Sequence, residues 1–349
     1  MRWANRATAS TEVKRRVASH QSGPLLTVAI PTCNGAAHIA QAIRSILSQE
    51  RVDFELVVSD DRSDDDTLTV VRAVAGDRAR VEVNSERLGL AGNWNRCAAL
   101  ARTPVVAIFH QDDLMLPGHL SAHAASFAAD GSIGLTASAS VVIDERGRAV
   151  SDAVVEQGGL GPIDRIFEPG QLARSMAGGN PLRCSAVMLR VAAFDEEEGF
   201  DSRFRYVVDW DCWLRISREW SIAWLARPTV QVRWHPASET HRFTSSLVDL
   251  DETAGMLELL FDRDLNDDPD AARLLAGAHD RLARAFLNRA HDALRAGLPE
   301  LARDALFRGL ECSPRLIKTI IGDPRLSISM AALAVAPRVA GRLFARRND

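Results

Sequence analysis

The stretch VVAIFHQDD, residues 105–113, constrains the fold of this chain more than any other part of it. Its first half is apolar and rich in β-branched residues, which is typical of a strand buried on both faces. Two carboxylates, Asp112 and Asp113, follow directly. In an open α/β sheet, ligands bind beyond the carboxyl ends of the strands, so this pair is placed to hold a divalent cation and phosphate oxygens. A polar turn without a ligand explains the same stretch and stays open at this point.

Strands and helices alternate through the first third of the chain. Apolar runs predict strands over residues 25–30, 54–59 and 81–83. Apolar residues at helical spacing predict helices over residues 38–48, 67–74 and 93–101, with a loop over 84–92. This alternation predicts right-handed βαβ crossovers, and therefore an α/β fold with a Rossmann-like, mainly parallel central sheet flanked by helices.

The pattern is less regular after Asp113. A helix is expected over residues 118–129, a strand over 134–143 and a turn over 144–148. Residues 150–179 contain several glycines and two prolines, which predicts a long loop with one helix near 171–176. Further strands are expected over 186–190, 222–225 and 229–234, and a helix over 209–219. From Leu247 the pattern becomes wholly helical.

Composition excludes several classes of protein. A formal net charge of −4 over 349 residues argues against a nucleic-acid-binding protein. The five cysteines are scattered and form no CxxC pair, which disfavours a zinc site and a disulfide framework and fits a reducing cytoplasm. Residues 1–24 include basic residues but no apolar segment, so we expect a mobile tail and neither a signal peptide nor a membrane anchor.

Acidic side chains also follow other predicted elements. Asp60 and Asp61 come directly after the second strand, and Asp209 and Asp211 stand at the start of a predicted helix. Because the carboxyl ends of parallel strands meet at one edge of a sheet, we expect the first of these pairs to lie near Asp112.

These acids stand within a series of sequence blocks that resembles the family 2 glycosyltransferases, nucleotide-sugar enzymes of the GT-A fold. The blocks occur in the family's order over residues 25–241 and read TVAIPTCNG, ELVVSDDRSDDDT, NSERLGLAGNWNRC, VVAIFHQDDLMLPGHL, NPLRCSAVMLR, FDSRFRYVVDWDCWLRIS and RWHP. The resemblance implies a GT-A catalytic domain over residues 25–245, with a nucleotide-binding half (25–115) and an acceptor half (116–245). Residues 246–349 are then a helical C-terminal appendage.

The resemblance implies where the nucleotide-sugar donor binds. Pro31 and Thr32 look like the loop that borders the nucleotide base, and Asp61 looks like the residue that hydrogen-bonds it. A carboxylate suits the N3–H donor of uracil or thymine, which favours UDP or dTDP. For Asp60, capping of the following helix is an equal alternative to ligand contact. The other residues expected at the donor site are Asn34, Asn93, Arg96, Gln111 and Asp112.

The resemblance also implies a metal site. Asp112 matches the last acid of the family's Asp-x-Asp motif, the direct ligand of Mn²⁺ or Mg²⁺, and a cation there assists departure of the nucleoside diphosphate. His235 resembles a late histidine that contacts the metal or diphosphate. His110 departs from the motif, whose first acid is usually Asp, and a buried, hydrogen-bonded structural histidine is the preferred interpretation of it.

Asp209 resembles the acid that serves as general base near the start of a helix. An inverting transfer needs one carboxylate to take the proton of the acceptor hydroxyl as it attacks the anomeric carbon. An acid favoured only by the helix dipole is the alternative. Val208 stands where the family often has Glu. Asp113, Asp211 and Trp210 are expected to be acceptor-side or supporting contacts.

The function implied is metal-dependent, inverting hexosyl transfer from a UDP- or dTDP-sugar to a glycan or lipid-linked acceptor in bacterial surface polysaccharide biosynthesis. A nucleotidyltransferase is disfavoured because no glycine-rich phosphate loop with a lysine follows the first strand. A non-catalytic carbohydrate-binding or scaffold protein that retains the fold stays open because of His110.

The C-terminal segment, residues 313–349, is basic and interleaved with apolar residues. It is too interrupted to span a bilayer. Peripheral contact with an anionic membrane surface, at the inner face of the plasma membrane, is one interpretation. Packing on the catalytic domain or on a second subunit of a homo-oligomer is the other.

Overall fold

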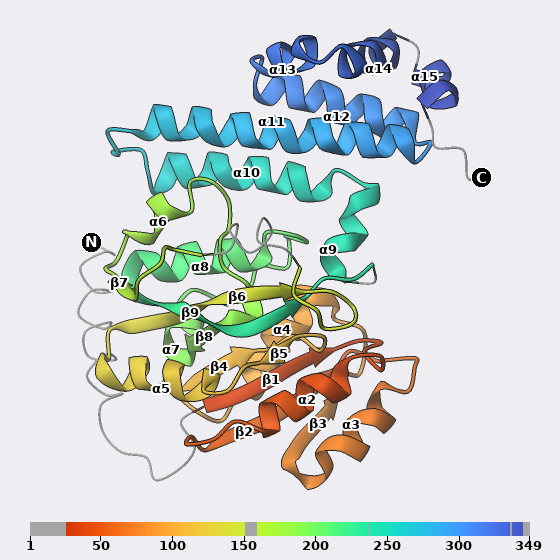
Figure 1. Ribbon diagram of the computed structural model, residues 1–349. Coiled ribbons are helices and arrows are strands. Elements are labelled where there is room, and N and C mark those ends of the chain that lie inside the picture. Colours follow the sequence, from red (N-terminus) through yellow and green to blue (C-terminus); the bar gives the residue numbers. More distant parts are fainter. Residues whose placement is uncertain (1–25, 151–158, 237, 336, 345–349) are drawn as a thin grey trace. The chain divides into compact units, whose positions relative to one another are not determined.

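The computed structural model describes residues 26–150, 159–236, 238–335 and 337–344 (Figure 1). The chain divides into two compact units. We call residues 1–172, 180–204 and 208–235 the sheet unit, and residues 173–179, 205–207 and 236–349 the helical unit. The predicted tail over residues 1–24 lies outside the described residues, and the expected division at residue 245 stays a prediction.

The sheet unit is built on a nine-stranded sheet in the order β3-β2-β1-β4-β8-β6-β9-β5, with β7 paired to β9. Strands β1 to β4 are mutually parallel. β8 runs antiparallel to β4 and opens a second half in which β6 and β9 are parallel. The predicted fold class is confirmed. The strands are β1 (Leu26–Thr32), β2 (Phe54–Asp60), β3 (Ala79–Val83), β4 (Val105–Ile108), β5 (Leu114–Met115), β6 (Ile133–Ile143), β7 (Arg165–Phe167), β8 (Val187–Arg190) and β9 (Ser221–Arg233).

Amphipathic helices cover this sheet. In α2, Ile39, Ile43 and Ile46 recur at helical spacing and are fully buried, so this face packs into the core with strands β1 and β4. The helices of the unit are α2 (Ile39–Leu47), α3 (Thr67–Ala75), α4 (Gly89–Leu100), α5 (His119–Ala129), α7 (Val191–Glu196) and α8 (Val208–Glu219), with 3₁₀ turns at Gly76–Arg78 and Cys184–Ala186. The short helix α6 (Leu172–Ser175) has its first residue in the sheet unit and the other three in the helical unit.

The carboxyl ends of three central strands lie at one edge of the sheet. Thr32 at the end of β1 is in register with Asp60 at the end of β2. The N–H of Phe109, just after β4, donates to the carbonyl of Ala29 in β1 at 2.9 Å. The loops that follow β1, β2 and β4 therefore start beside one another, as the sequence predicts.

Two elements differ from the sequence-based prediction because distant residues determine them. The strands expected over 222–225 and 229–234 are one strand, β9, in which Pro228 is accommodated by a register shift against β6. The loop expected over 84–92 ends early, because α4 begins at Gly89, where the Asp61 carboxylate accepts the N–H groups of Leu88 and Gly89. The residues around Pro228 do not show that it pairs with β6, and the residues around Gly89 do not show its contact with Asp61.

The loop expected over 150–179 contains a strand as well as the predicted helix. β7 pairs antiparallel with β9 through residues 165–167, and the indole N–H of Trp224 donates to the carbonyl of Gly161 at 2.9 Å. Residues 151–158 of this loop lie outside the described residues. Gly161 and residues 165–167 of the loop are thus attached to β9.

The helical unit has its own core. Phe286 and Ala290 of α11 are buried, and Arg289 of the same helix forms an ion pair with Asp249 of α10 at 2.7 Å. Its helices are α9 (Glu239–Arg242), α10 (Val248–Arg263), α11 (Ala271–Arg295), α12 (Pro299–Cys312), α13 (Leu316–Gly322), α14 (Pro324–Val335) and α15 (Pro337–Phe344), with a 3₁₀ turn at Phe243–Ser245. Among the described residues, no helix has both the length and the apolar character needed to cross a membrane.

Candidate functional site

The loop after β1 is fastened to the acidic loop after β2. Asn34 adopts the left-handed backbone conformation, with φ of 52°. Its side-chain oxygen accepts the N–H of Asp64 at 2.8 Å, and its own N–H donates to the Ser63 hydroxyl at 2.9 Å. The N–H of Gly35 donates to Thr67 Oγ1 at 2.7 Å. Asn34 is therefore at the predicted edge, where its polar atoms hold the two loops together.

Gln111 fastens the loop after β4 to the loop after β1. Its Oε1 accepts a hydrogen bond from the hydroxyl of Thr32 and another from the N–H of Cys33 at 3.2 Å, while its Nε2 donates to the Cys33 carbonyl at 3.2 Å. A β-carbon at Gly35 would overlap the Gln111 side chain, so only glycine permits this approach. Pro31, which precedes Thr32 in β1, is half-buried.

Asp60 is buried and stabilises its own loop. Its two oxygens accept the N–H of Ser63 at 3.0 Å and the Ser63 hydroxyl at 2.6 Å. It does not cap α3, because the N–H of Thr67 donates to Asp65 instead. The alternative that Asp60 caps α3 is therefore wrong, and its carboxylate stabilises the turn at Ser63 instead.

Asp61 is also buried, and it accepts three hydrogen bonds. Its donors are Asn84 Nδ2 at 2.9 Å and the N–H groups of Leu88 at 2.8 Å and Gly89 at 3.0 Å. A carboxylate offers about four lone-pair sites, so about one is left for a ligand. Asp61 thus holds the start of α4 and retains capacity to accept one further hydrogen bond.

Two residues predicted at the donor site occupy different surroundings. Asn93 is buried, its Oδ1 accepting from the Ser59 hydroxyl at 2.8 Å and from Asn84 Nδ2 at 3.1 Å, while its Nδ2 donates to the Ser59 carbonyl at 3.1 Å. Direct contact between Asn93 and a ligand would break these bonds, so its position favours support of Asp61 through Asn84. Arg96, by contrast, is exposed on α4.

The acidic pair after β4 is held by the end of β9. Asp112 Oδ2 lies 2.9 Å from His235 Nε2. The hydrogen bond from His235 and the charge of His110 lower the pKa of Asp112 although burial opposes its ionisation. Asp113 Oδ1 accepts the backbone N–H of Arg233 at 2.8 Å. Burial and the neighbouring Asp112 raise the pKa of Asp113 to about 8.

His110 is not a buried structural histidine. Its side chain is 33% exposed and its ring stacks on Trp94 at 5.1 Å between centroids. Its backbone N–H donates to the Ser185 hydroxyl at 3.0 Å. The burial expected from sequence is therefore wrong in extent: the imidazole is half-buried beside the two carboxylates, with its Nδ1 3.9 Å from Asp113 Oδ2.

These side chains have the composition of a metal site. One ligand atom from each of His110, Asp112 and Asp113 lies within 4.8 Å of the others. Ligands about 2.0–2.5 Å from one cation are up to about 5 Å apart, so the three side chains fit around a single ion. Carboxylate oxygens and imidazole nitrogens are both ligands of divalent cations, so this set of side chains suits such an ion. His235 is hydrogen-bonded to the Asp112 carboxylate and therefore orients that carboxylate.

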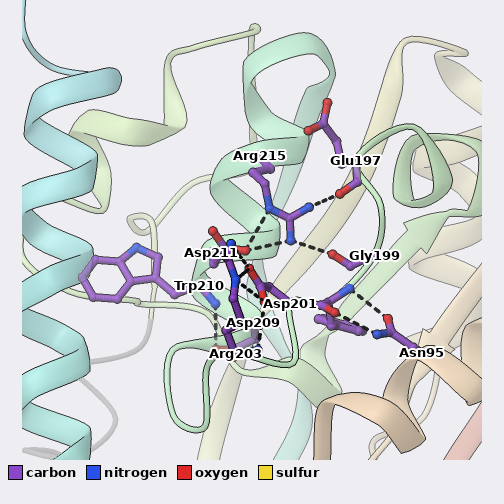
Figure 2. A network of polar contacts seen from close by, with 10 residues as sticks. Asn95, Glu197, Gly199, Asp201, Arg203, Asp209, Trp210, Asp211 and Arg215 are labelled. Carbon is purple, nitrogen blue, oxygen red and sulfur yellow. Dashed lines mark hydrogen bonds and ion pairs between the residues drawn. The ribbon is translucent and has the colours of Figure 1, made fainter.

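Asp209 lies in the first turn of α8, and its Oδ1 accepts the N–H of Trp210 at 2.8 Å (Figure 2). Burial raises the pKa of Asp209 to about 6, while the charges of His110 and Arg183 act in the opposite direction. Because the charge of His110 acts on both Asp112 and Asp209, the two predicted functional acids share one electrostatic environment.

Asp211 is part of a clamp that supports α8 (Figure 2). It forms an ion pair with Arg215 at 2.7 Å, one turn later in the helix. Arg215 also donates to the carbonyl of Glu197 and, at 2.6 Å, to that of Gly199. Asp211 is thus committed to Arg215, and Trp210 is buried with its indole pointing away from this clamp (Figure 2).

Three residues near the acids had no predicted role. Arg183 lowers the pKa of Asp209 by its charge. The Ser185 hydroxyl accepts the backbone N–H of His110, and Arg233 donates to the Asp113 carboxylate and to the Asp112 carbonyl. Each lies within a block that resembles the family, but nothing in the local sequence distinguishes a buried arginine or serine that contacts a distant loop from one that packs elsewhere.

Two solved structures with similar folds were determined in complex with nucleotide sugars. The structure matches Staphylococcus aureus TarS, residues 1–349, in complex with UDP-GlcNAc, with a TM-score of 0.54 over 91% of this chain and 90% of that one at 15% identity. It also matches the mannosyltransferase PcManGT from Pyrobaculum calidifontis in complex with GDP-Man and Mn²⁺, with a TM-score of 0.53, 17% identity, and 96% and 93% of the two chains covered. The fold is therefore of the GT-A class.

Sequence comparison leads to the family itself. The model of the family "Glycosyl transferase family 2" matches residues 27–187. The putative glycosyltransferase EpsE of Bacillus subtilis is 30% identical over 203 residues, which span 57% of this chain and 68% of that protein. The chain belongs to glycosyl transferase family 2, and the enzyme class predicted from its sequence blocks is confirmed.

Proposed function

We propose that this glycosyltransferase moves a hexose from a nucleoside-diphosphate sugar to a hydroxyl group of a glycan or lipid-linked acceptor in surface polysaccharide biosynthesis, with inversion at the anomeric carbon. One observation carries the proposal. Asp112 belongs to a cluster with His110 and Asp113 whose ligand atoms lie within 4.8 Å of one another, and Asp209, at the start of α8, is a separate half-buried carboxylate whose pKa is raised to about 6. An inverting transferase needs these two functions beside one another.

In this proposal the donor diphosphate binds at the ends of β1 and β4. Asp112 holds Mn²⁺ or Mg²⁺, with His110 and His235 beside it. A bound cation neutralises negative charge on the departing nucleoside diphosphate. Asp113, with its pKa raised to about 8, is protonated at neutral pH in the metal-free protein, so the close pair does not carry two full charges.

Asp209 is the proposed general base. With a pKa of about 6 it is ionised at neutral pH, yet it is basic enough to accept the proton of a sugar hydroxyl during attack. The N–H of Trp210 fixes one carboxylate oxygen and leaves the other for the acceptor. Attack and departure then take place on opposite faces of the anomeric carbon, which inverts its configuration.

The proposed base of the donor is uracil or thymine. The lone pair that remains on Asp61 can accept one N–H, which matches the single N3–H of these pyrimidines. The UDP-GlcNAc bound by TarS supports this choice, whereas PcManGT binds GDP-Man. The base therefore needs a direct test.

An anionic membrane surface is a proposed partner of the helical unit, which would suit a lipid-linked acceptor. Helices α13, α14 and α15 expose large apolar side chains, among them Ile321 at 68%, Ile328 at 65% and Leu343 at 69%. Residues 313–349 carry seven basic and two acidic residues, a net charge of +5 in a chain whose net charge is −4. Apolar and basic side chains together favour binding at the surface of an anionic bilayer.

A transfer assay tests the proposed reaction. The protein is incubated with Mn²⁺, UDP-, dTDP- and GDP-hexoses and a polyprenyl-diphosphate-linked sugar, and the product is analysed by mass spectrometry and by NMR of the new anomeric centre. We expect one sugar to be added from one donor with inverted configuration. Binding of donor without any transfer, in the wild type and in Asp209→Asn alike, would instead favour a carbohydrate-binding or scaffold protein.

A further inference from the structure

Arg233, at the end of β9, is buried with 4% of its surface exposed, and its guanidinium joins three segments of the sheet unit. Its Nε donates to the backbone carbonyl of Asp112 at 3.0 Å. Its Nη1 donates to the carbonyls of Asp144 at 3.1 Å and Glu145 at 3.0 Å, and its Nη2 to Gln41 Oε1 at 2.9 Å. The loop after β4, the turn after β6 and helix α2 thus meet on one side chain.

The backbone of the same residue contacts the other acid. The N–H of Arg233 donates to Asp113 Oδ1 at 2.8 Å, and His235, two residues later, contacts the carboxylate of Asp112 at 2.9 Å. Arg233, the last residue of β9, therefore contacts the Asp112 carbonyl and the Asp113 carboxylate, while His235, just beyond the strand, contacts the Asp112 carboxylate. The orientation of the carboxylates depends on where β9 ends, and the Arg233 side chain fastens that end to its surroundings.

The side-chain partners of this guanidinium are neutral oxygens of the backbone and of an amide. These hydrogen bonds fix the backbone carbonyls of Asp112, Asp144 and Glu145 relative to one another. The donors of the planar guanidinium point in fixed directions, so it contacts three carbonyls at once. A lysine ammonium cannot donate to all of these carbonyls together.

We propose that Arg233 is a positioning residue for the metal site: it presets the acidic loop so that Asp112, with His110 and His235, meets a divalent cation without rearrangement. The inference rests on the proposed function, since it assumes that the acidic pair binds a metal. It assigns Arg233 no contact with the cation or the substrate. Groups that orient metal ligands typically change metal affinity by about 10- to 100-fold when they are replaced.

The test measures Mn²⁺ binding alone, by the electron paramagnetic resonance signal of free Mn²⁺, with no donor present. Arg233→Lys keeps the charge and removes the fork. The matched control is Arg190→Lys, because Arg190 is equally buried at 4% exposure, donates to the Ile133 carbonyl at 2.8 Å, and is in register with Val105 at the opposite end of β4. Gln41→Met is a milder second variant that removes one acceptor of the fork.

We expect the Kd for Mn²⁺ to rise by about 10- to 100-fold in Arg233→Lys, to rise by a smaller factor in Gln41→Met, and to stay at the wild-type value in Arg190→Lys. Melting curves identify the temperature at which each variant is folded, and binding is compared there. Wild-type affinity in both folded Arg233→Lys and Gln41→Met would overturn the inference alone. If Arg233→Lys does not fold, Gln41→Met decides. Absence of Mn²⁺ binding by the wild type would overturn the proposed metal site as well.

Discussion

At the scale of single residues, the acids of the site differ because their surroundings differ. Asp60 and Asp61 accept several hydrogen bonds from loops that they order. Asp211 is neutralised by Arg215. Asp209 is different, since burial raises its pKa to about 6 and its Oδ1 accepts a hydrogen bond from the N–H of the next residue, Trp210. It is the acid whose surroundings best suit proton transfer at neutral pH.

Replacing Asp209 with Asn removes the proposed base while keeping the shape of the side chain. We expect kcat to fall by about 10²- to 10⁴-fold, the usual contribution of general base catalysis, with nucleotide affinity unchanged. Initial rates of transfer measure the first and titration calorimetry the second. Asp195→Asn, at an exposed acid on α7, is the matched control and should leave kcat unaltered. A fall in nucleotide affinity equal to the fall in kcat would contradict the assignment.

The pH dependence of the same enzyme gives a separate prediction. Because the pKa of Asp209 is raised to about 6, the carboxylate is protonated and inactive as a base below that pH and ionised above it. We therefore expect kcat to rise with pH through about 6 and then to level off. Transfer rates between pH 5 and 8 at saturating donor measure this limb. A kcat that is flat through this range, with chemistry shown to limit the rate, would exclude Asp209 as the base.

Residue identities alone could indicate Asp61, Asp112 and Asp209, because an acid at the end of a strand or the start of a helix is a local feature of the sequence. They could not indicate what these acids contact. The expected burial of His110 was wrong because the surroundings of its ring depend on packing against Trp94 of α4, a contact that the local sequence does not show. The roles of the site residues stay predictions until they are tested.

At the scale of elements, prediction succeeded where the signal is local. α2 and β4 follow from helical spacing and from a short apolar run, since each is specified by its own residues. Prediction failed where a residue distant in sequence determines the bounds of an element. β9 continues past Pro228 because its register against β6 shifts there. α4 begins earlier than predicted because the Asp61 carboxylate accepts the N–H groups of Leu88 and Gly89. Both failures lie next to the candidate site, where segments distant in sequence meet.

Helix α5 provides a prediction about stability. His119 and His123 are fully buried, with their Nδ1 atoms 2.7 Å from Thr229 Oγ1 and 2.6 Å from Thr136 Oγ1. Burial lowers the pKa of both, that of His123 to about 3. Below about pH 6.5 the unfolded chain binds protons that the folded chain does not, so the free energy of unfolding should decrease as pH falls from 6.5 towards 3.

The variant His123→Gln keeps a polar partner for Thr136 and cannot be protonated. Urea unfolding at several pH values should show that it loses less stability on acidification than the wild type, by about 1 kcal/mol or more per pH unit well below 6.5. His291→Gln, at a histidine that is 43% exposed, serves as control and should follow the wild type. Parallel pH profiles for all three proteins would show that the buried histidine is not the cause.

At the scale of the whole molecule, the distribution of charge and apolar surface matters. Four large apolar side chains of α13 and α14 are exposed in the helical unit, which also contains the basic C-terminal segment; they are Ile317, Ile321, Ile328 and Val335. The basic residues beyond 344 lie outside the described residues, so their contribution is judged by charge alone. The two features together predict binding to anionic membranes that is sensitive both to salt and to loss of apolar side chains.

Sedimentation with lipid vesicles measures that binding. We expect the protein to sediment with vesicles that contain phosphatidylglycerol and not with phosphatidylcholine alone, and the double variant Ile321→Gln/Ile328→Gln to bind less. The control is Ile163→Gln/Ile166→Gln, two isoleucines exposed by 70% and 46% in the sheet unit. Equal binding by both double variants would contradict the prediction. A dimer that dissociates in the first double variant would identify a second copy as the partner.

The central claim is that Asp112 binds a metal through which this chain holds a nucleotide. The measurement that tests it most directly is calorimetric titration of UDP, dTDP and GDP into the protein, with and without Mn²⁺, beside Asp112→Ala. The account predicts that a uracil or thymine nucleotide binds only when Mn²⁺ is present and that the variant loses this binding. Binding of equal strength in Asp112→Ala, or no binding of any of the three nucleotides by the wild type, would contradict it.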